Sequence, residues 1–327
     1  MRRTVSGAVV VLGTVLLGGC GQSVTPTGAA DDTGVRSIEN CGRTVTVNGE
    51  PERLVSMMPG TTDLLVRLGV GDHIVAEAQS KGAPLNAELD SQAVERLSED
   101  GPPSREVLLN VAPDLVVSPT SYEFTAEQGF ASIDQLSDAG AAVYISTAGC
   151  FDRRKTAEVS DLIVDIENLS ALLGTERVGA ELADDVRAEI VTITQAVDDQ
   201  PKPTVAQLFI EGTTISAVGA GLEYDIIRTA GGDNVFDPGD PEFSDFIAAV
   251  ISPEELIARD PEVLVVSVMS DAHEQSVRAL LADRFPDVAA VRDGRIIAVS
   301  SDAVMPGTWG NLEVLRQLAG AFHPSVF

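Results

Sequence analysis

Few residues of this sequence lie at spacings that support catalysis. It has no H-E-x-x-H, G-x-S-x-G, phosphate-binding-loop or C-x-x-C motif, the short patterns of zinc hydrolases, serine nucleophiles, nucleotide-binding loops and redox thiols. Its three histidines, His73, His273 and His323, lie far apart, whereas sites for free metal ions use several His and carboxylate ligands. We therefore expect no enzyme, no cofactor and no metal site. The enzymatic alternative is a hydrolase with carboxylates such as Glu211 and Asp225.

The composition narrows the class of protein further. The chain has 327 residues, of which 44% are apolar and 22% charged, which predicts a globular protein of about two domains. Its 22 basic and 50 acidic residues give a net charge of −28, and such a field repels a phosphate backbone. After the N-terminus, no apolar run reaches the roughly 18 residues of a membrane span. These properties exclude a nucleic-acid-binding protein and an integral transporter or channel.

The N-terminal residues form a targeting signal. Two arginines precede an apolar stretch over residues 8–17, which is too short for a stable membrane span. The run Leu-Gly-Gly-Cys that ends at Cys20 resembles the lipidation box of bacterial lipoproteins. We predict a signal peptide over 1–19, a lipid on Cys20, a flexible tether over 20–35, and attachment to the extracytoplasmic face of the bacterial cell membrane. A plain signal peptide with a chance Cys is the alternative.

Two further cysteines, Cys41 and Cys150, remain after the targeting signal. An exported chain with an even pair of cysteines is typical of disulfide formation. We therefore predict one disulfide, which would tie the start of the folded region to a segment more than a hundred residues later. The alternative is a pair of buried free thiols.

Short apolar strands alternate with helical patterns in both halves of the chain, which predicts α/β lobes with parallel-rich sheets. Between the halves, apolar residues at helical spacing predict helices over 156–173 and 175–199. The second helix would be about 36 Å long, the width of a small domain. The predicted parts are an N-terminal lobe over 36–173, an interdomain helix over 174–199 and a C-terminal lobe over 200–327.

One segment of the first half resembles one of the second. Residues 104–117 align with 252–265 without a gap, and Ser, Glu, Leu and Pro coincide. Each segment predicts a capped helix, a turn at Pro and an apolar strand. We infer two related lobes, with a chance similarity of two helix–Pro–strand units as the alternative.

Aromatic and methionine side chains gather in loops that follow expected strands. The segments 56–63, 118–124, 209–225, 267–274 and 300–310 hold the single Trp, two of the three Tyr and four of the five Met. Loops at the carboxyl ends of parallel strands bind ligands in α/β proteins, and flat rings with flexible thioethers suit a large, partly apolar ligand. Some of these side chains, such as Met57 and Phe209, are as consistent with the core. The candidate ligand-binding residues are Met58, Pro59, Tyr122, Glu211, Tyr224, Met305 and Trp309.

The order of several short motifs resembles one family. The chain is similar to the substrate-binding lipoproteins of ABC importers for iron–siderophore complexes, cobalamin and haem. The matching segments are 51–56 with Pro59, 62–65, 68–75, 112–116, 230–236 and 251–254. Asp63 stands where Glu is more usual, which keeps the charge. The resemblance implies two α/β lobes joined by one long rigid helix, a ligand cleft between the lobes, an ABC permease as partner and a monomeric protein.

Within that family, the charge of the five loop segments indicates the type of ligand. The segments hold no Lys or Arg, and Lys81 is the nearest cation in a neighbouring loop. Citrate-like and catecholate complexes carry several negative charges that a cleft must offset with cations. We expect a neutral or cationic chelate instead, a hydroxamate-type ferric siderophore first, with cobalamin or haem as alternatives. A lipoprotein that has lost its ligand and serves only in interactions is a further alternative.

The resemblance also implies two docking residues. In this family one surface Glu on each lobe contacts Arg residues of the permease, and Glu106 and Glu254 match those positions. Each lies two residues after a Ser that can cap a helix. A Glu in the first turn of a helix is also favourable without any partner. We expect both residues to dock against the permease.

Overall fold

The computed structural model describes residues 34–327. The predicted signal peptide, the lipidation site at Cys20 and nearly all of the predicted tether lie outside the described residues. Val35, the last residue of that tether prediction, already begins strand β1 (Val35–Asn40). Among the described residues, no helix is long and apolar enough to cross a membrane.

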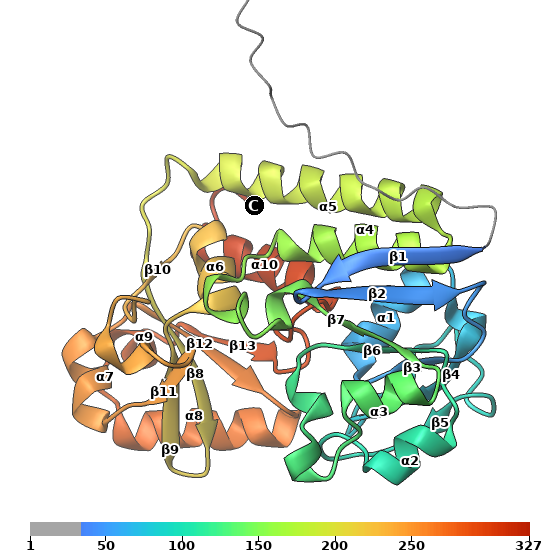
Figure 1. Ribbon diagram of the computed structural model, residues 1–327. Helices are drawn as coiled ribbons and strands as arrows, with labels where there is room; N and C mark the ends of the chain where they lie inside the picture. The colour runs from blue at the N-terminus through green and yellow to red at the C-terminus, as the bar shows by residue number, and fades with distance from the viewer. Residues whose placement is uncertain (1–33) are drawn as a thin grey trace, which may run out of the picture.

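The N-terminal lobe contains a five-stranded sheet in which every pairing is parallel. In spatial order its strands are β5 (Glu95–Arg96), β4 (Ile74–Glu77), β3 (Leu54–Ser56), β6 (Leu115–Ser118) and β7 (Ala142–Ile145). Its helices are α1 (Pro59–Arg67), α2 (Arg105–Asn110) and α3 (Ile133–Asp138). An antiparallel hairpin of β1 and β2 (Arg43–Asn48) lies beside it (Figure 1).

The C-terminal lobe contains a six-stranded mixed sheet. Its strands are β11 (Ala248–Val250), β9 (Thr214–Val218), β8 (Thr204–Glu211), β12 (Val263–Val268) and β13 (Ile296–Ser300), with β10 (Asp233–Asn234) beside β8. Strands β8 and β9 are antiparallel because a tight hairpin joins them, and a parallel pair needs a long crossover. The helices are α6 (Gly221–Thr229), α7 (Pro253–Arg259), α8 (Asp271–Arg284), α9 (Ala289–Arg292) and α10 (Gly310–Phe322).

The two sequence segments that resemble each other occupy equivalent places. Ser104 caps α2 and Ser252 caps α7, each through its side-chain oxygen. The strands that follow, β6 and β12, lie next to the first strand of their lobe, β3 and β8 respectively. Short 3₁₀ turns complete the lobes at Gly71–His73, Tyr122–Phe124, Ala126–Gln128, Thr147–Gly149, Arg154–Thr156 and Pro241–Phe243.

Two antiparallel helices connect the lobes. Helix α4 (Asp161–Leu173) ends at Gly174, whose φ of 72° reverses the chain. Helix α5 (Glu176–Val197) then has 22 residues and runs back over both lobes to β8 (Figure 1). The predicted long interdomain helix is therefore present, packed on α4 and, beyond it, on α10 and α6.

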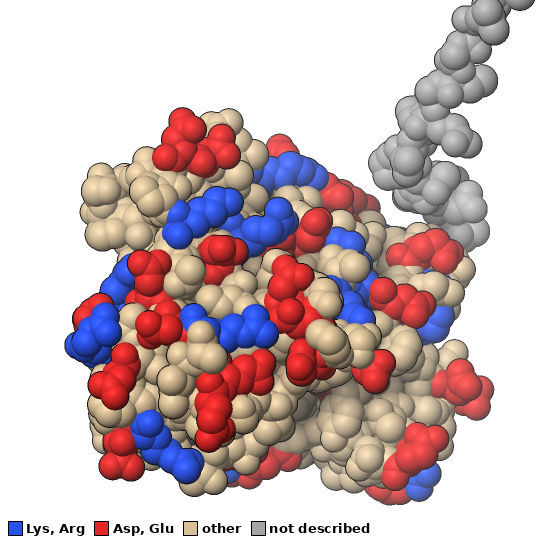
Figure 2. Space-filling model, turned by 90° about the vertical axis from the view of Figure 1, so that its left-hand side faces the viewer, with Lys and Arg blue, Asp and Glu red and all other residues tan. Residues whose placement is uncertain are grey.

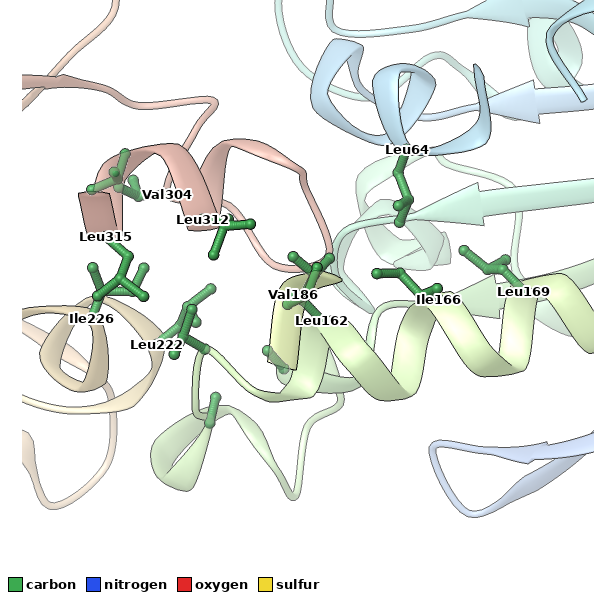
Figure 3. Packing of buried hydrophobic residues seen from close by; sticks show 14 of the residues in the cluster. Leu64, Leu162, Ile166, Leu169, Val186, Leu222, Ile226, Val304, Leu312 and Leu315 are labelled. Carbon is green, nitrogen blue, oxygen red and sulfur yellow. The ribbon is translucent and has the colours of Figure 1, made fainter. Parts of the chain in front are cut away.

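One hydrophobic core continues from lobe to lobe. Alternate residues of both sheets, such as Leu115 in β6 and Val265 in β12, face a single cluster with α4, α5 and α10. Figure 3 shows Leu64, Ile166, Val186, Ile226 and Leu315 within this cluster. The intervening residues of each sheet face separate cores on the outer sides. Because the inner core is shared, a large separation of the lobes would expose buried apolar surface, so the fold favours limited lobe motion.

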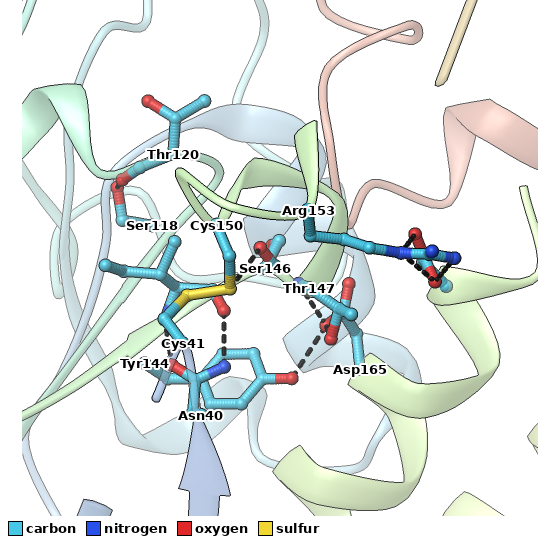
Figure 4. The surroundings of a disulfide bond; sticks show 12 residues. Asn40, Cys41, Ser118, Thr120, Tyr144, Ser146, Thr147, Cys150, Arg153 and Asp165 are labelled. Atoms are coloured by element: carbon cyan, nitrogen blue, oxygen red, sulfur yellow. Dashed lines mark hydrogen bonds and ion pairs between the residues drawn. A yellow bond between two sulfur atoms is a disulfide. The ribbon is translucent and has the colours of Figure 1, made fainter. Parts of the chain in front are cut away.

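The predicted disulfide is present. Cys41, in the turn of the β1–β2 hairpin, is bonded to Cys150, which follows β7 (Figure 4). The neighbouring Asn40 donates from its amide to the carbonyl of Ile145 (2.7 Å) and accepts from its amide N–H (2.9 Å). The hairpin is thereby fixed to the loop that leaves β7.

A buried carboxylate orders the same loop. Asp165 on α4 accepts hydrogen bonds from the hydroxyls of Tyr144 (2.7 Å) and Thr147 (2.6 Å) and from the Thr147 amide (2.7 Å). Burial raises the pKa of the Asp165 carboxyl to about 7, although these hydrogen bonds oppose the shift. The loop after β7 thus has two attachments, the disulfide and Asp165.

Candidate ligand-binding cleft

The more apolar of two hollows between the lobes has a volume of about 480 Å³, within the range of small-molecule sites. Its N-terminal-lobe wall consists of Thr120, Ser121, Tyr122, Thr125, Ala148, Gly149, Phe151 and Arg154. The C-terminal lobe contributes Leu222, Glu223, Phe246, Ile247, Val304, Met305 and Pro306. We call this space the aromatic hollow. Two predicted site residues, Tyr122 and Met305, are part of it.

Three aromatic rings of the aromatic hollow are unusually exposed. Tyr122, Phe151 and Phe246 have 54%, 68% and 47% of their surface accessible. Tyr122 is steadied by an edge-on contact with Phe130, with ring centroids 5.7 Å apart. Large apolar side chains that stay exposed at a concave site are typical of ligand binding. Neither phenylalanine was among the sequence candidates, because both lie outside the five loop segments.

An arginine in the same hollow corrects the expectation of a cleft without cations. Arg154 follows β7, and its guanidinium lies 4.5 Å from the centre of the Phe151 ring and 5.0 Å from that of Phe246. The five loop segments chosen from the sequence did not include the loop after the expected strand 142–145. Its place after a strand was the signal that could have identified Arg154. A ligand with a negative group is therefore compatible with this wall.

One acidic residue lines the C-terminal-lobe side of the aromatic hollow. Glu223, in the first turn of α6, accepts hydrogen bonds at Oε2 from Gln207 (2.5 Å) and Ser267 (3.1 Å). Within residues 34–327, no hydrogen bond reaches its Oε1. Burial raises the pKa of the Glu223 carboxyl to about 7, with the two hydrogen bonds opposing. Glu223 can therefore offer a ligand either a carboxylate or a neutral acid near pH 7.

A second hollow of about 520 Å³ contains two more predicted residues, Pro59 and Trp309. The loop over 304–309 separates the two hollows, since its first residues line one and its last residues line the other. Among the described residues that line the second hollow there is no Lys or Arg, and its acids are Asp63, Glu77, Asp302 and Glu313. We call it the acidic hollow. Here the predicted acidic character of the cleft is present.

Three predicted residues lie elsewhere or are inaccessible. Met58 is only 7% exposed and precedes α1, which begins at Pro59, a residue favoured at the first helical position. Glu211 is exposed at the β8–β9 hairpin, outside both hollows. Tyr224 donates a hydrogen bond to Asp237 (3.1 Å) and lines neither hollow.

Asp225 and the three histidines make hydrogen-bond contacts within the protein. Asp225 is buried and accepts a hydrogen bond from the Val159 amide (2.8 Å), which joins α6 to the segment before α4. The ring nitrogens of His73, His273 and His323 lie within hydrogen-bond distance of backbone carbonyls. Within residues 34–327, no three His, Cys, Asp or Glu side chains form a group that could hold a metal ion.

The lobes touch closely beside the hollows. A Cβ atom on Gly221 would lie 2.4 Å from the carbonyl oxygen of Arg154, and one on Gly60 would lie 2.6 Å from the Thr308 methyl carbon. Both contacts join one lobe to the other, and only glycine permits them. The lobes are therefore in close contact at these two points beside the cleft.

Comparison with known proteins agrees with this architecture. The family model described as periplasmic binding protein matches residues 54–303. The chain belongs to the periplasmic binding protein family. It is a substrate-binding protein of an ABC importer, and the binding proteins that it resembles are not enzymes.

Individual relatives of this periplasmic binding protein are distant but cover most of it. A vitamin B12-binding protein of Vibrio campbellii is 23% identical over 84% of this chain and 91% of its own. An uncharacterized ABC transporter substrate-binding lipoprotein of Bacillus subtilis is 23% identical over 98% of this chain and 97% of its own. The structure of an ABC-type Fe3+-hydroxamate transport system from Saccharomonospora viridis has a TM-score of 0.71, with 24% identity over 88% of this chain and 98% of that one.

In this binding protein, both predicted docking residues lie on the surface. The Glu106 side chain is 70% exposed and pairs with the adjacent Arg105 at 2.6 Å, which lowers the pKa of its carboxyl. Glu254 is exposed in the first turn of α7. Neither residue lines a hollow. Figure 2 shows the C-terminal-lobe end of the molecule, where acidic and basic side chains are interspersed.

Proposed function

We propose that this binding protein captures a bulky metal chelate of low net charge, a cobalamin-type corrinoid in the first place, and delivers it to an ABC permease. The observation that carries the proposal is the aromatic hollow, where exposed rings from both lobes surround polar groups with free hydrogen-bonding capacity. A corrinoid presents a broad conjugated face that packs on such rings. Relatives named for vitamin B12 or cobalamin support this ligand.

Polar groups of the cleft also suit a corrinoid. The rim of a corrin ring carries neutral amide side chains that donate and accept hydrogen bonds. The free Oε1 of Glu223 can accept from such an amide, and the acids of the neighbouring acidic hollow offer further acceptors. A chelate that lacks donors at its rim would leave these groups unpaired, which disfavours its binding.

A ferric hydroxamate siderophore is the second candidate. The wall of the aromatic hollow contains four hydroxyl side chains, Thr120, Ser121, Tyr122 and Thr125. Thr120 and Thr125 already donate to Glu123 and to the Tyr122 carbonyl. The hydroxyls of Ser121 and Tyr122 can donate to the oxygen atoms that surround iron in such a chelate. The predicted lipid on Cys20 is part of the proposal in both cases, since it would keep the protein at the membrane beside its permease.

Fluorescence titration tests the proposed function. Ligand-free protein is titrated with cyanocobalamin, a ferric hydroxamate, a ferric catecholate and haem, while Trp309 and Tyr fluorescence is followed. We expect saturable quenching by cyanocobalamin or the hydroxamate, with a Kd of about 1 μM or tighter. The variant Glu211→Gln, outside both hollows, should bind equally well.

Three other results are informative. Binding of the catecholate alone would contradict a chelate of low net charge. Binding of haem alone would replace the corrinoid with the family's third ligand class. No fluorescence change with any of the ligands would favour a lipoprotein that serves only in interactions.

A further inference from the structure

The guanidinium of Arg154 lies beside the aromatic hollow without an ion-pair partner among the described residues. The structure places its half-buried guanidinium between Phe151 of its own lobe and Phe246 of the other lobe. Among residues 34–327, no carboxylate oxygen lies within 4.0 Å of it and no side-chain hydrogen bond uses its donors. Most arginines of this acidic protein do pair, as Arg153 next to it does with Asp161 at 2.9 Å. A guanidinium has five N–H donors, and those of Arg154 stay free beside the aromatic hollow.

The acid of the same hollow does not neutralise Arg154. Glu223 lies on the opposite lobe and forms no ion pair with it. The close contact between Gly221 and the Arg154 carbonyl fixes the two segments at this separation. Two groups of opposite charge therefore face one space without meeting, and each is open to a bound molecule.

The stacking of Arg154 defines what its donors can bind. A guanidinium that lies close to two rings can still use its N–H edges for hydrogen bonds, and those edges match the paired oxygens of a phosphate or carboxylate. The rings also hold the side chain in one conformation before binding, which lowers the entropy lost on binding. In a protein with a net charge of −28, an unpaired cation beside the aromatic hollow gives an anionic group a favourable contact there.

We propose that Arg154 recognises a single anionic group at the edge of the chelate, the phosphodiester in the case of a cobalamin. The inference rests on the proposed function, because it identifies which part of the corrinoid faces the N-terminal-lobe wall. The rings of Phe151 and Phe246 then contact the apolar part of the ligand. Such a ligand can be neutral overall and still carry a negative phosphate group, because the positive charge of the metal centre balances the negative charge of the phosphate.

Two corrinoids and matched variants test this assignment. Cyanocobalamin carries the phosphodiester, whereas dicyanocobinamide lacks the nucleotide loop that contains it. For Arg154→Gln, we expect the Kd of cyanocobalamin to rise about 10- to 100-fold, the usual effect of losing hydrogen bonds to a charged group. The Kd of dicyanocobinamide should change less than about threefold, because its binding uses the rings but not the guanidinium.

Two further variants separate charge, packing and folding. Arg154→Lys keeps the charge without the planar donors and should bind cyanocobalamin with intermediate affinity. Arg177→Gln removes an equal charge from α5, where Arg177 is exposed and pairs with Glu181, and should leave both affinities unchanged. Thermal unfolding of each variant identifies any loss of structure, and Arg154→Lys then supplies the measurement if Arg154→Gln is unfolded.

The possible outcomes distinguish the proposed corrinoid ligand from the proposed role of Arg154. An equal loss of affinity for both corrinoids would overturn the inference and show that Arg154 acts by packing on the rings. Unchanged binding of cyanocobalamin would also overturn it, while the corrinoid function would stand. If the wild-type protein bound neither corrinoid, the proposed ligand would be wrong and the phosphodiester assignment would fail with it.

Discussion

Uptake is expected to stop when Glu106 and Glu254 are both changed to Arg. Each residue is exposed in the first turn of a helix, one on each lobe, and the resemblance to importer binding proteins predicts that both meet arginines of the permease. Two opposed like charges at an interface cost several kcal/mol. Each single reversal should reduce transport about tenfold or more, and the double reversal should bring it to background, as measured by uptake of labelled ligand into cells.

The ligand affinity of these variants should stay unchanged although their transport is reduced. Neither glutamate lines the aromatic or the acidic hollow, so the Kd of the double variant should stay within about twofold of wild type. The control reverses two exposed acids, Glu181 on α5 and Asp198 directly after it. Helix α5 lies on the side of the molecule away from α2 (Figure 1). Normal uptake by the control and by the double variant would contradict docking through these glutamates. A weakened Kd in the double variant would assign the glutamates to the fold or the cleft instead.

Removal of the disulfide has the largest expected effect on stability. The bond between Cys41 and Cys150 spans 109 residues, and closing a loop of that size stabilises a protein by about 4–5 kcal/mol in the chain-entropy model. Measured losses on removing native disulfides are about 2–5 kcal/mol. We expect Cys41→Ser with Cys150→Ser to lower the free energy of unfolding by that amount in urea denaturation.

The same double variant should bind its ligand more weakly. Ala148, Gly149, Phe151 and Arg154, which all lie within four residues of Cys150, form one wall of the aromatic hollow. The hydrogen bonds of Asn40 and Asp165 remain to hold the loop, so we expect a loss of several-fold rather than a complete loss. Wild-type protein treated with a thiol reductant serves as the control. A free energy of unfolding within about 0.5 kcal/mol of wild type would contradict a stabilising role for the bond.

Periodic and local signals in the sequence were sufficient for the architecture. The apolar spacing over 175–199 predicted helix α5, because a helix that packs along its whole length must repeat apolar residues every three to four positions. The Ser–Glu–Leu–Pro echo predicted equivalent helix–strand units, since caps and proline turns are short-range features.

The site was predicted only in part, for a physical reason. Tyr122, Met305, Pro59 and Trp309 lie in loops after strands, and the structure brings them to the two hollows. Phe151, Arg154 and Phe246 lie in segments that the pattern did not select, and they meet only because the lobes are placed face to face. Contacts between side chains far apart in the chain leave no periodic signal, so the unpaired arginine was visible only in three dimensions.

A metal chelate is expected to bind between the lobes at the aromatic hollow. Crystals of the protein with cyanocobalamin, measured at the cobalt absorption edge, would locate the metal directly. We predict one anomalous peak beside Tyr122, Phe246 and Met305. A cobalt ion found instead in the groove between α1, α5 and α10, lined by Arg67, Leu182 and Arg316, would contradict binding at the aromatic hollow.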